Sequence, residues 1–403
     1  MTRYQFLNLK RYVEQFLMSP FVLLGRLSYW VWGNKEQDYS VYFFLPIYGV
    51  GGAEYINAHI LEALNDKKIL VLFTRKSKDS STLHLFQHPN TEIKDISKWT
   101  DNKLLYFANF FLRGYYAAMI QRNKSKTLVF NAQCNFAYKL CPHLPKRVPV
   151  LELIHLFDPV FANVWVPFIS FLKKRFCFST IEINTIETYA QQAGVPAHYL
   201  NRFIKLRAFA KVPQQYIVNK KASEVLHVFY AGRGTTQKRL WLHFEIARRV
   251  KALGLPIQFH YVGNFQDELP NDIDQLGKYY GIIASGEKMY QFMQGMDLLL
   301  LTSGSEGFPV ILLESMPFGI IPVVTPVGEM SQAIRPFENG ILLDNSNEEA
   351  VIRTGVEAIV QLASDKILCQ KIAVNIRSDY ERLYRFENFT KEIQQQIDAC
   401  LVP

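Results

Sequence analysis

The sequence predicts an α/β protein with two domains, each built on a parallel β-sheet. Two observations predict this class. Short, wholly apolar runs alternate with segments of helical periodicity, and the pattern begins again after residue 220. Strands of a parallel sheet read as continuous apolar runs because helices cover both faces of the sheet. With 403 residues, the chain is long enough for two hydrophobic cores.

In the first half, a strand is expected to end at Pro46, and a glycine-rich loop then opens a helix over residues 53–64. Further apolar runs of strand length follow along the chain. The expected strands cover residues 41–45, 69–73, 127–130 and 148–154.

The second half repeats this alternation. Its expected strands cover residues 225–232, 257–263, 297–302 and 321–325, with helices over 240–253 and from about Pro309. The stretch 205–223 has no clear periodicity, so we place the domain boundary there.

The positive charge lies in the first half. Residues 1–210 hold 26 Lys and Arg against 14 Asp and Glu, a net charge of +12, whereas residues 211–403 hold 19 against 22, a net charge of −3. This asymmetry suggests an anionic partner for the first half: a membrane surface, a phosphate-bearing lipid or a nucleic acid. A solvated surface that aids solubility is the alternative interpretation.

Two segments bear on membrane contact. The start of the chain lacks the apolar core and cleavage site of a signal peptide. Residues 16–32 are apolar, aromatic and interrupted by Arg26, which suits either an interfacial helix or an ordinary helix packed on the domain. Residues 157–178 combine aromatics with Lys173, Lys174 and Arg175, as at a membrane interface, while two prolines argue against a spanning helix. We therefore expect a cytoplasmic protein, peripheral on the membrane at most.

The cysteines predict neither a disulfide framework nor a structural zinc site. There are five of them, without a C-x-x-C pair or a metal-like spacing. A reducing compartment fits this usage.

The strongest functional signal is the run from Leu298 to Glu314. A buried strand leads into the small-residue loop Thr302–Pro309, and a helix then begins. Open α/β sheets bind ligands beyond the carboxyl ends of their strands, where free helix amides also attract anions. Glu306 lies in the loop and Glu314 in the helix, so the two carboxylates can reach different hydroxyls of one extended ligand, such as those of a sugar and a ribose. Alternatively, Glu314 is a surface charge and the Ser-Glu-Gly sequence a capping turn.

Two further loops carry candidate ligand contacts. Arg233 and Lys238 stand five residues apart in the loop that leaves the strand 225–232, an arrangement suited to a diphosphate. Gly51 and Gly52 permit close approach of the backbone to a ligand. The dinucleotide fingerprint G-x-G-x-x-G fails because Glu54 replaces its third glycine, and no Walker lysine follows.

His155 directly follows the strand 148–154 and would lie at the carboxyl edge of the first sheet. Histidines at strand ends are more often structural than catalytic, but this position allows it to face a cleft. Asp158 either orients it or caps a following turn.

Taken together, these residues resemble the retaining GT-B glycosyltransferases of family 4 over most of the chain. Glu306 and Glu314 correspond to the E-x7-E motif, Gly232-Arg233 with Lys238 to the donor-phosphate pair, and His155 to the first-domain histidine. The loop at Gly51-Gly52-Ala53-Glu54 resembles the family's glycine loop. Residues 194–196 resemble the segment before the interdomain crossing, and Phe386-Glu387-Asn388-Phe389 the start of the terminal helix. Three departures stand out: Arg239 replaces a frequent glycine, Gly234-Thr235-Thr236 replaces an apolar run, and the segment 202–207 lacks a common Asn-Gly pair.

The resemblance implies a GT-B fold with two Rossmann-like domains facing a cleft. Residues 1–205 would bind the acceptor, residues 206–385 the nucleotide sugar, and residues 386–403 would form a helix that crosses back to the first domain. The implied donor is a nucleoside-diphosphate sugar, and the implied acceptor a glycan or lipid-linked molecule of cell-surface polysaccharide or lipopolysaccharide synthesis. We expect no metal ion, no other cofactor and no nucleic-acid partner.

The resemblance also implies roles for single residues. Arg233 and Lys238 would neutralise the departing diphosphate. Glu306, with the amides of Gly307 and Phe308, would hold the donor sugar, and Glu314 would bind the ribose. His155 would touch the sugar or orient the acceptor, and the transfer would retain configuration.

Other functions stay open at this stage. A nucleotide-sugar epimerase or a sugar phosphorylase uses the same two-domain frame, although epimerases lack E-x7-E with paired cations. A degenerate scaffold that binds nucleic acid or another anion would show steep salt dependence.

Overall fold

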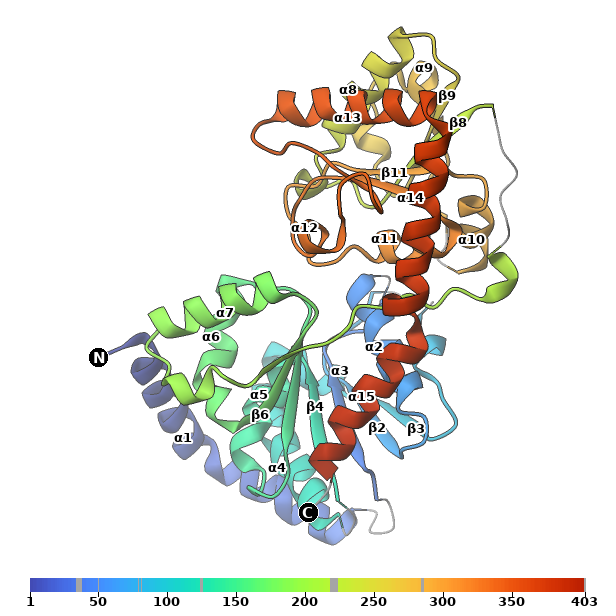
Figure 1. The fold of residues 1–403 in the computed structure, drawn as a ribbon. Helices are drawn as coiled ribbons and strands as arrows, with labels where there is room; N and C mark the ends of the chain where they lie inside the picture. The colour runs from blue at the N-terminus through green and yellow to red at the C-terminus, as the bar shows by residue number, and fades with distance from the viewer. Residues whose placement is uncertain are drawn as a thin grey trace. The chain divides into compact units, whose positions relative to one another are not determined.

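The computed structural model describes residues 1–33, 38–49, 51–78, 80, 82–123, 126–217, 224–283 and 286–401. The chain divides into two compact units. The first comprises Met1–Leu206 with Thr390–Pro403, and the second comprises Arg207–Phe389. Each unit is an α/β layer structure around its own sheet (Figure 1).

The first unit contains a seven-stranded, fully parallel sheet of order β3-β2-β1-β4-β5-β6-β7. Its strands are β1 (Val41–Leu45), β2 (Ile69–Phe73), β3 (Thr91–Asp95), β4 (Leu128–Ala132), β5 (Val150–Ile154), β6 (Leu172–Cys177) and β7 (Phe203–Lys205). Its helices are α1 (Arg3–Trp32), α2 (Gly52–Ala63), α3 (Ser97–Thr100), α4 (Tyr106–Arg122), α5 (Asn135–Leu140), α6 (Pro159–Trp165) and α7 (Thr180–Gln192).

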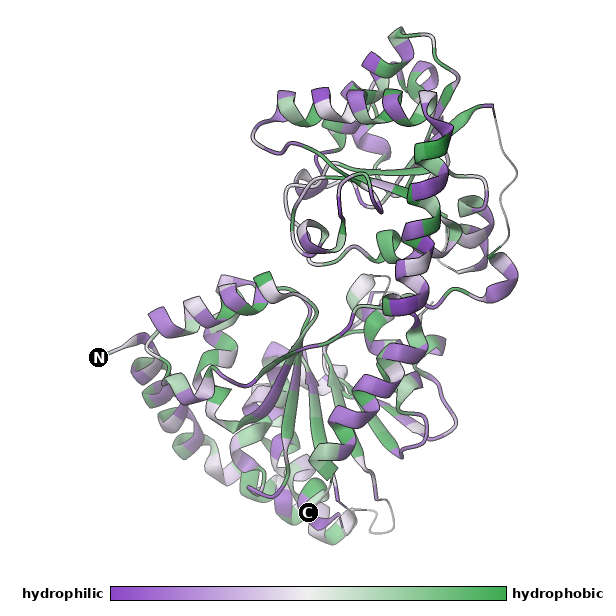
Figure 2. Cartoon of the chain, in the orientation of Figure 1, coloured by the Kyte–Doolittle hydropathy of each residue, from purple (hydrophilic) through white to green (hydrophobic). Residues whose placement is uncertain are grey.

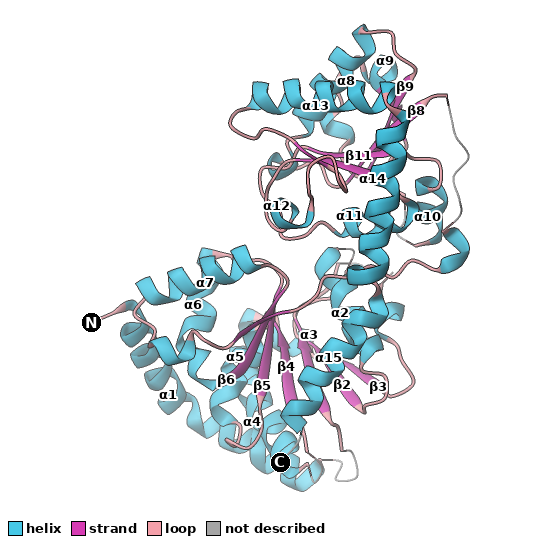
Figure 3. Ribbon diagram, in the orientation of Figure 1, coloured by secondary structure: helices cyan, strands magenta, loops and turns pink. Residues whose placement is uncertain are grey.

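The second unit contains a six-stranded, fully parallel sheet of order β10-β9-β8-β11-β12-β13. Its strands are β8 (Leu226–Ala231), β9 (Ile257–Val262), β10 (Gly277–Tyr279), β11 (Leu298–Leu301), β12 (Ile321–Val324) and β13 (Ile341–Leu342). Its helices are α8 (Leu240–Ala252), α9 (Ile273–Leu276), α10 (Glu287–Met293), α11 (Val310–Ser315), α12 (Met330–Ala333), α13 (Glu348–Ser364) and α14 (Lys366–Asp379). Figure 3 shows helices on both faces of this sheet.

The prediction of two Rossmann-like domains with parallel sheets is confirmed. Strands β1, β2 and β11 carry only apolar or aromatic side chains, and the central strands are mostly green in Figure 2. All residues of β1, β2, β4 and β11 are buried, because helices on both faces exclude water from both sides of each strand.

The last helix, α15 (Phe386–Leu401), packs back on the first unit through its second half, as expected. Lys67 forms an ion pair with Asp398 at 2.8 Å, and Gln394 donates a hydrogen bond to the carbonyl oxygen of Ala63. The expected boundary stretch 205–223 contains the step between the units after Leu206, while its residues 218–223 lie outside the described residues.

The expectation that residues 157–178 form a membrane-facing surface is wrong. The segment folds into α6, a 3₁₀ turn (Val166–Phe171) and β6, and most of its apolar side chains belong to the core. Arg175 is fully buried in β6, where its guanidinium pairs with the buried Glu152 of β5. Lys174 donates a hydrogen bond to the side chain of Gln396 at 2.8 Å. Of the basic run, Arg175 lies in the interior of the fold and Lys173 is exposed.

Candidate functional site

The candidate site of the second unit lies where its strand order reverses. Strands β8 and β11 are neighbours in the sheet, but the chain runs outward to β9 from one and to β12 from the other. Loops that leave two such strands diverge and open a crevice at the carboxyl edge of the sheet. The loop after β8 carries Arg233 and Lys238, and the loop after β11 carries Glu306. The two loops that the sequence singled out therefore lie at the same carboxyl edge of the second sheet.

Lys238 and Glu306 form an ion pair. Ser303 donates a hydrogen bond from its hydroxyl to Oε1 of the same carboxylate at 2.6 Å. The lysine and glutamate side chains keep only 16% and 8% of their surface exposed, so the pair is largely shielded from water. The structure thus joins two predicted site residues that the sequence separates by more than sixty positions.

Arg239 fixes the loop of Lys238 against the loop of Glu306. Its backbone is left-handed, with φ of 49°, where glycine is favoured. Its guanidinium donates hydrogen bonds to the carbonyl oxygens of Thr302 and Ser303, at 2.7 and 3.1 Å, and to Oδ1 of Asn345 at 2.7 Å. Arg239 therefore has a strained backbone, and its side chain links the loop of Lys238 to the loop of Glu306.

A third loop, after β12, packs against the backbone of the loop that carries Glu306. The hydroxyl of Thr325 donates a hydrogen bond to the carbonyl oxygen of Ser303 at 2.6 Å. The amide of Glu329 donates one to the carbonyl oxygen of Gly307 at 2.9 Å. Gly328 has φ of +57°, and a β-carbon there would lie 2.0 Å from the carbonyl oxygen of Glu306. Only glycine permits this close approach.

Arg233, in the same loop as Lys238, presents an exposed side chain. The hydroxyl of Tyr230 donates a hydrogen bond to the carbonyl oxygen of Arg233 at 2.8 Å, which holds the backbone in place. Within the described part of the chain, no hydrogen bond or ion pair engages its guanidinium. This cation is therefore available to an anionic ligand.

The other predicted residues after β11 are Gly307 and Phe308 in the loop and Glu314 in the helix that follows it. The amides of Gly307 and Phe308 donate no hydrogen bond within the described residues, and the Phe308 ring packs edge-on against Tyr384. Glu314 lies in α11 with 5% of its surface exposed, and this burial raises its pKa to about 7. No hydrogen bond or ion pair joins Glu314 to Lys238 or Glu306 among the residues that the structure covers.

In the first unit, His155 and the glycine loop lie at one edge of the sheet. Nε2 of His155 is 3.1 Å from Oδ1 of Asn57 in α2, the helix that begins at Gly52 and has Gly51 as its N-cap. Because an amide oxygen only accepts hydrogen bonds, Nε2 carries the proton and Nδ1 presents a lone pair. That Nδ1 is buried and has no partner within the described residues. Burial lowers the pKa of His155 to about 4, so the ring is neutral at pH 7.

Gln133 holds the His155 loop in place. It follows β4 with a left-handed φ of 51°. Its side-chain oxygen accepts a hydrogen bond from the amide of His155 at 3.0 Å, and its nitrogen donates to the carbonyl oxygen of Leu156 at 3.1 Å. Asp158 does not orient His155; it caps α6 by accepting a hydrogen bond from the amide of Val160.

Several of these supporting residues escaped the sequence analysis. Asn57 carried a usable signal, because it lies one turn into the helix that follows the predicted glycine loop. Gln133 carried none, since a left-handed backbone cannot be read from a residue type that rarely adopts it, whereas the frequent glycine at the position of Arg239 indicated such a backbone there. Among the described residues, no group of three or more His, Cys, Asp and Glu side chains is arranged to hold a metal ion.

The sequence of the second unit resembles a known family. Residues 213–379 match the family model of the glycosyl transferases group 1. An uncharacterized glycosyltransferase of Methanocaldococcus jannaschii is 25% identical over 170 residues, which cover 41% of this chain. The match spans 43% of that relative's length.

The fold over most of the chain resembles solved glycosyltransferase structures. The HepE protein of Anabaena, solved in complex with UDP and glucose, has a TM-score of 0.67 at 18% identity, covering 89% of this chain and 99% of its own. The lipopolysaccharide outer core galactosyltransferase WaaB has a TM-score of 0.63 at 18% identity, covering 88% and 99%. At this identity the likeness shows the fold, and that fold is GT-B.

Proposed function

We propose that this chain is a retaining glycosyltransferase that moves a sugar from a nucleoside-diphosphate sugar to a glycan or lipid-linked acceptor. One observation carries the proposal: the Lys238–Glu306 pair stands at the strand reversal of the second sheet, with the exposed cation of Arg233 on the same edge. A sugar diphosphate offers both an anionic group for the cations and hydroxyls for the carboxylate. The match of residues 213–379 to the glycosyl transferases group 1 supports this interpretation.

Arg233 and Lys238 are proposed to stabilise the leaving group. As the bond between the anomeric carbon and the phosphate oxygen breaks, negative charge grows on the diphosphate. Preorganised cations in a site with little water stabilise such charge strongly. In the free protein, Lys238 is paired with Glu306, so a bound diphosphate would share the lysine with that carboxylate. Two protein cations supply the charge, and the proposed reaction uses no metal ion.

The donor sugar and its nucleotide are proposed to bind along the loop after β11 and α11. Glu306 would accept hydrogen bonds from sugar hydroxyls, while the amides of Gly307 and Phe308, which donate no hydrogen bond within the described chain, would add two donors. Glu314 would accept hydrogen bonds from the ribose hydroxyls. The HepE structures with UDP and with UDP-glucose support a nucleotide sugar as the donor class.

Retention is proposed to proceed on one face of the donor. The new bond to the acceptor oxygen forms on the face that the diphosphate leaves, and a phosphate oxygen takes the acceptor's proton. The neutral His155 would accept a hydrogen bond from a hydroxyl at its free Nδ1. The structural likeness to WaaB, a lipopolysaccharide outer core galactosyltransferase, supports an acceptor in cell-surface polysaccharide or lipopolysaccharide synthesis.

The test is thermal unfolding of the full chain with a panel of nucleotides (UDP, GDP, ADP, CMP and dTDP) in buffer containing a metal chelator. A ligand that binds only the folded state stabilises it by about 2.7 kcal/mol at a hundredfold excess over its Kd. We expect one diphosphate to shift the transition selectively, and Lys238→Ala to lose the shift. Lys371→Ala, which removes an exposed lysine of α14, serves as the matched control. A folded protein that responds to none of the nucleotides would contradict the proposal.

A further inference from the structure

Helix α1 turns its apolar side outward. Large apolar side chains recur every three or four residues along its solvent face, including Leu9, Val13, Phe16, Leu24, Leu27 and Val31. Each of them is at least half exposed, and Phe16 reaches 79%. A helix on the surface of a water-soluble domain normally shows the opposite arrangement, with its apolar stripe on the core.

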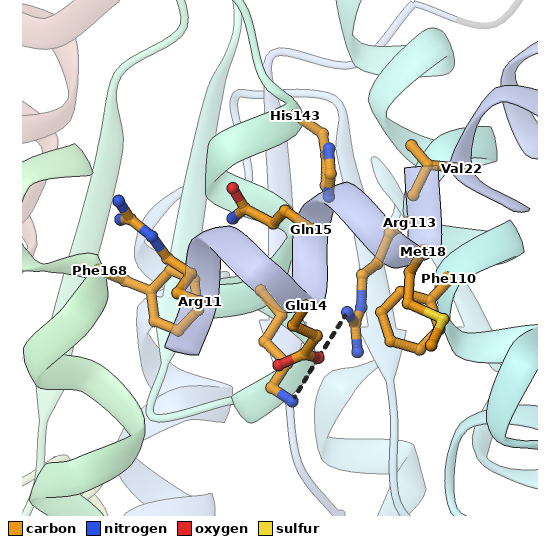
Figure 4. A pocket seen from close by; sticks show the side chains of 10 residues that line it. Arg11, Glu14, Gln15, Met18, Val22, Phe110, Arg113, His143 and Phe168 are labelled. Atoms are coloured by element: carbon orange, nitrogen blue, oxygen red, sulfur yellow. Dashed lines mark hydrogen bonds and ion pairs between the residues drawn. The ribbon is translucent and has the colours of Figure 1, made fainter. Parts of the chain in front are cut away.

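The side of α1 that faces the first unit buries Val22, Gly25 and Tyr29, and it also carries charged and polar groups. Figure 4 shows Glu14 directed toward Arg113 of α4. Glu14 forms ion pairs with Arg113 at 3.7 Å and with Lys139 of α5 at 3.1 Å. Arg11 is buried and donates a hydrogen bond to the carbonyl oxygen of Pro167 at 2.6 Å. Arg26 donates to the carbonyl oxygen of His143 at 2.7 Å.

These inward contacts fix the rotation of α1 about its axis. The helix lies along α4 (Figure 1), and two glycines bring the backbones together. A β-carbon at Gly25 would lie 1.9 Å from the carbonyl oxygen of Phe111, and one at Gly114 would lie 1.9 Å from that of Val22. The helix therefore cannot roll its apolar stripe inward without breaking the ion pairs of Glu14 and this close packing.

The apolar surface continues from α1 onto the start of α4. Phe21 stacks on Phe107 with ring centroids 4.6 Å apart, and both Phe107 and the neighbouring Leu104 are largely exposed. Monomeric soluble proteins rarely expose a contiguous apolar patch above a few hundred Å². A row of Leu, Phe, Val and Trp side chains, each at least half exposed, runs along the thirty residues of α1 and indicates a binding surface.

We propose that this outward face of α1 lies on the surface of an anionic lipid bilayer. The helix is about 45 Å long at 1.5 Å per residue, a long and narrow stripe of the kind that lies flat in the headgroup region. Trp30 and Trp32 are exposed at its end, and tryptophan is enriched at this depth of a membrane. No described helix is long and apolar enough to cross a membrane, so α1 binds in the plane of the surface.

Charge favours an anionic surface over a zwitterionic one. The only carboxylate in residues 1–33, Glu14, points inward and is paired, whereas Arg3 and Lys10 are exposed. Residues 1–210 carry the net charge of +12. Lysine and arginine close to anionic lipid headgroups strengthen binding additively. The proposal goes beyond glycosyl transfer and stands independently of it, because vesicle binding is measured without a substrate.

The test is flotation of the full-length protein with vesicles of phosphatidylethanolamine and phosphatidylglycerol. The variant Phe16→Glu/Leu24→Glu places two carboxylates on the outward face without touching the inward contacts. We expect it to bind at least about tenfold more weakly than the wild type, because it loses two apolar side chains from the interface. Its unfolding temperature should stay unchanged. Ile367→Glu, which changes an equally exposed apolar residue of α14 in the second unit, is the control and should bind like the wild type.

Three outcomes would overturn the proposal. The first is equal vesicle binding by the wild type and Phe16→Glu/Leu24→Glu. The second is equal binding of the wild type to vesicles of phosphatidylcholine alone, which would contradict an anionic surface. The third is a lipid-free dimer in sedimentation velocity that Phe16→Glu/Leu24→Glu dissociates, which would assign the face to a second copy of the chain.

Discussion

The buried carboxyl of Glu314 links the stability of the second unit to pH. Glu314 is 5% exposed, and burial raises its pKa from 4.5 to about 7. The folded chain thus holds this proton more tightly than the unfolded chain does. The stabilisation is complete below pH 4.5 and is lost as the pH rises through 7. A difference of about 2.5 pKa units corresponds to about 3 kcal/mol, more than half of which falls between pH 5 and pH 8.

Glu314→Gln removes this titration and keeps nearly the same shape. We expect the free energy of unfolding of the wild type, relative to that of the variant, to fall by about 2 kcal/mol between pH 5 and pH 8. Urea unfolding of both proteins at a series of pH values measures this difference. Other titrating groups, such as buried histidines, are common to both proteins and cancel.

Glu357→Gln controls for the loss of one carboxylate at the surface, since Glu357 lies on the exposed side of α13. If the wild type and Glu314→Gln show the same dependence of unfolding free energy on pH, the burial argument for Glu314 is refuted. If they differ in the opposite direction, the carboxylate is held in its ionised form by a group that the structure does not place beside it.

Three further predictions concern the residues that support the fold and the site. Arg239→Ala should destabilise the chain by about 2 kcal/mol in urea unfolding, because its hydrogen bonds are lost. Arg239→Gly should destabilise it by about 1 kcal/mol less, because glycine adopts the left-handed backbone without strain. Equal losses of unfolding free energy in the two variants would contradict backbone strain at Arg239. Gly328→Ala should both lower the unfolding temperature and weaken nucleotide binding, because its β-carbon would displace the backbone of Glu306. A nucleotide affinity equal to that of the wild type would show that the loop of Gly328 does not shape the site. Arg175→Met should lower the free energy of unfolding by roughly 4 kcal/mol, because it leaves Glu152 buried without its partner. Arg175→Met/Glu152→Leu should recover part of that loss in the same assay. A double variant less stable than Arg175→Met would refute the role of Arg175 as the partner of the buried Glu152.

Much of the fold was predictable because parallel strands are buried on both faces. The apolar runs at β1, β2, β8, β9, β11 and β12 stand out from their surroundings, and the glycine loop and the loop around Glu306 follow strands directly. Among the strands that were not predicted are β3 and β6. The first reads Thr-Glu-Ile-Lys-Asp, and the second contains Lys-Lys-Arg, so neither carries the apolar pattern of a buried strand.

The errors share one physical cause: the sequence does not reveal where a charged side chain finds its partner. Arg175 reads as a surface cation, yet Glu152, distant along the chain, holds it inside the sheet. The same holds for Arg239, whose partners lie in loops more than sixty residues away. The exposed stripe of α1 became visible only when the structure showed which side of the helix carries Glu14 and its partners.

The central claim is that the second unit recognises a nucleoside diphosphate through Lys238 and Arg233. Calorimetric titration of the selected nucleoside diphosphate and its monophosphate, without metal ions, tests this claim most directly. We expect the diphosphate to bind the wild type at least about tenfold more tightly than the monophosphate, since the second phosphate meets two cations. In Arg233→Ala/Lys238→Ala, the two affinities should become nearly equal. A preference for the diphosphate that survives in this variant would contradict the account.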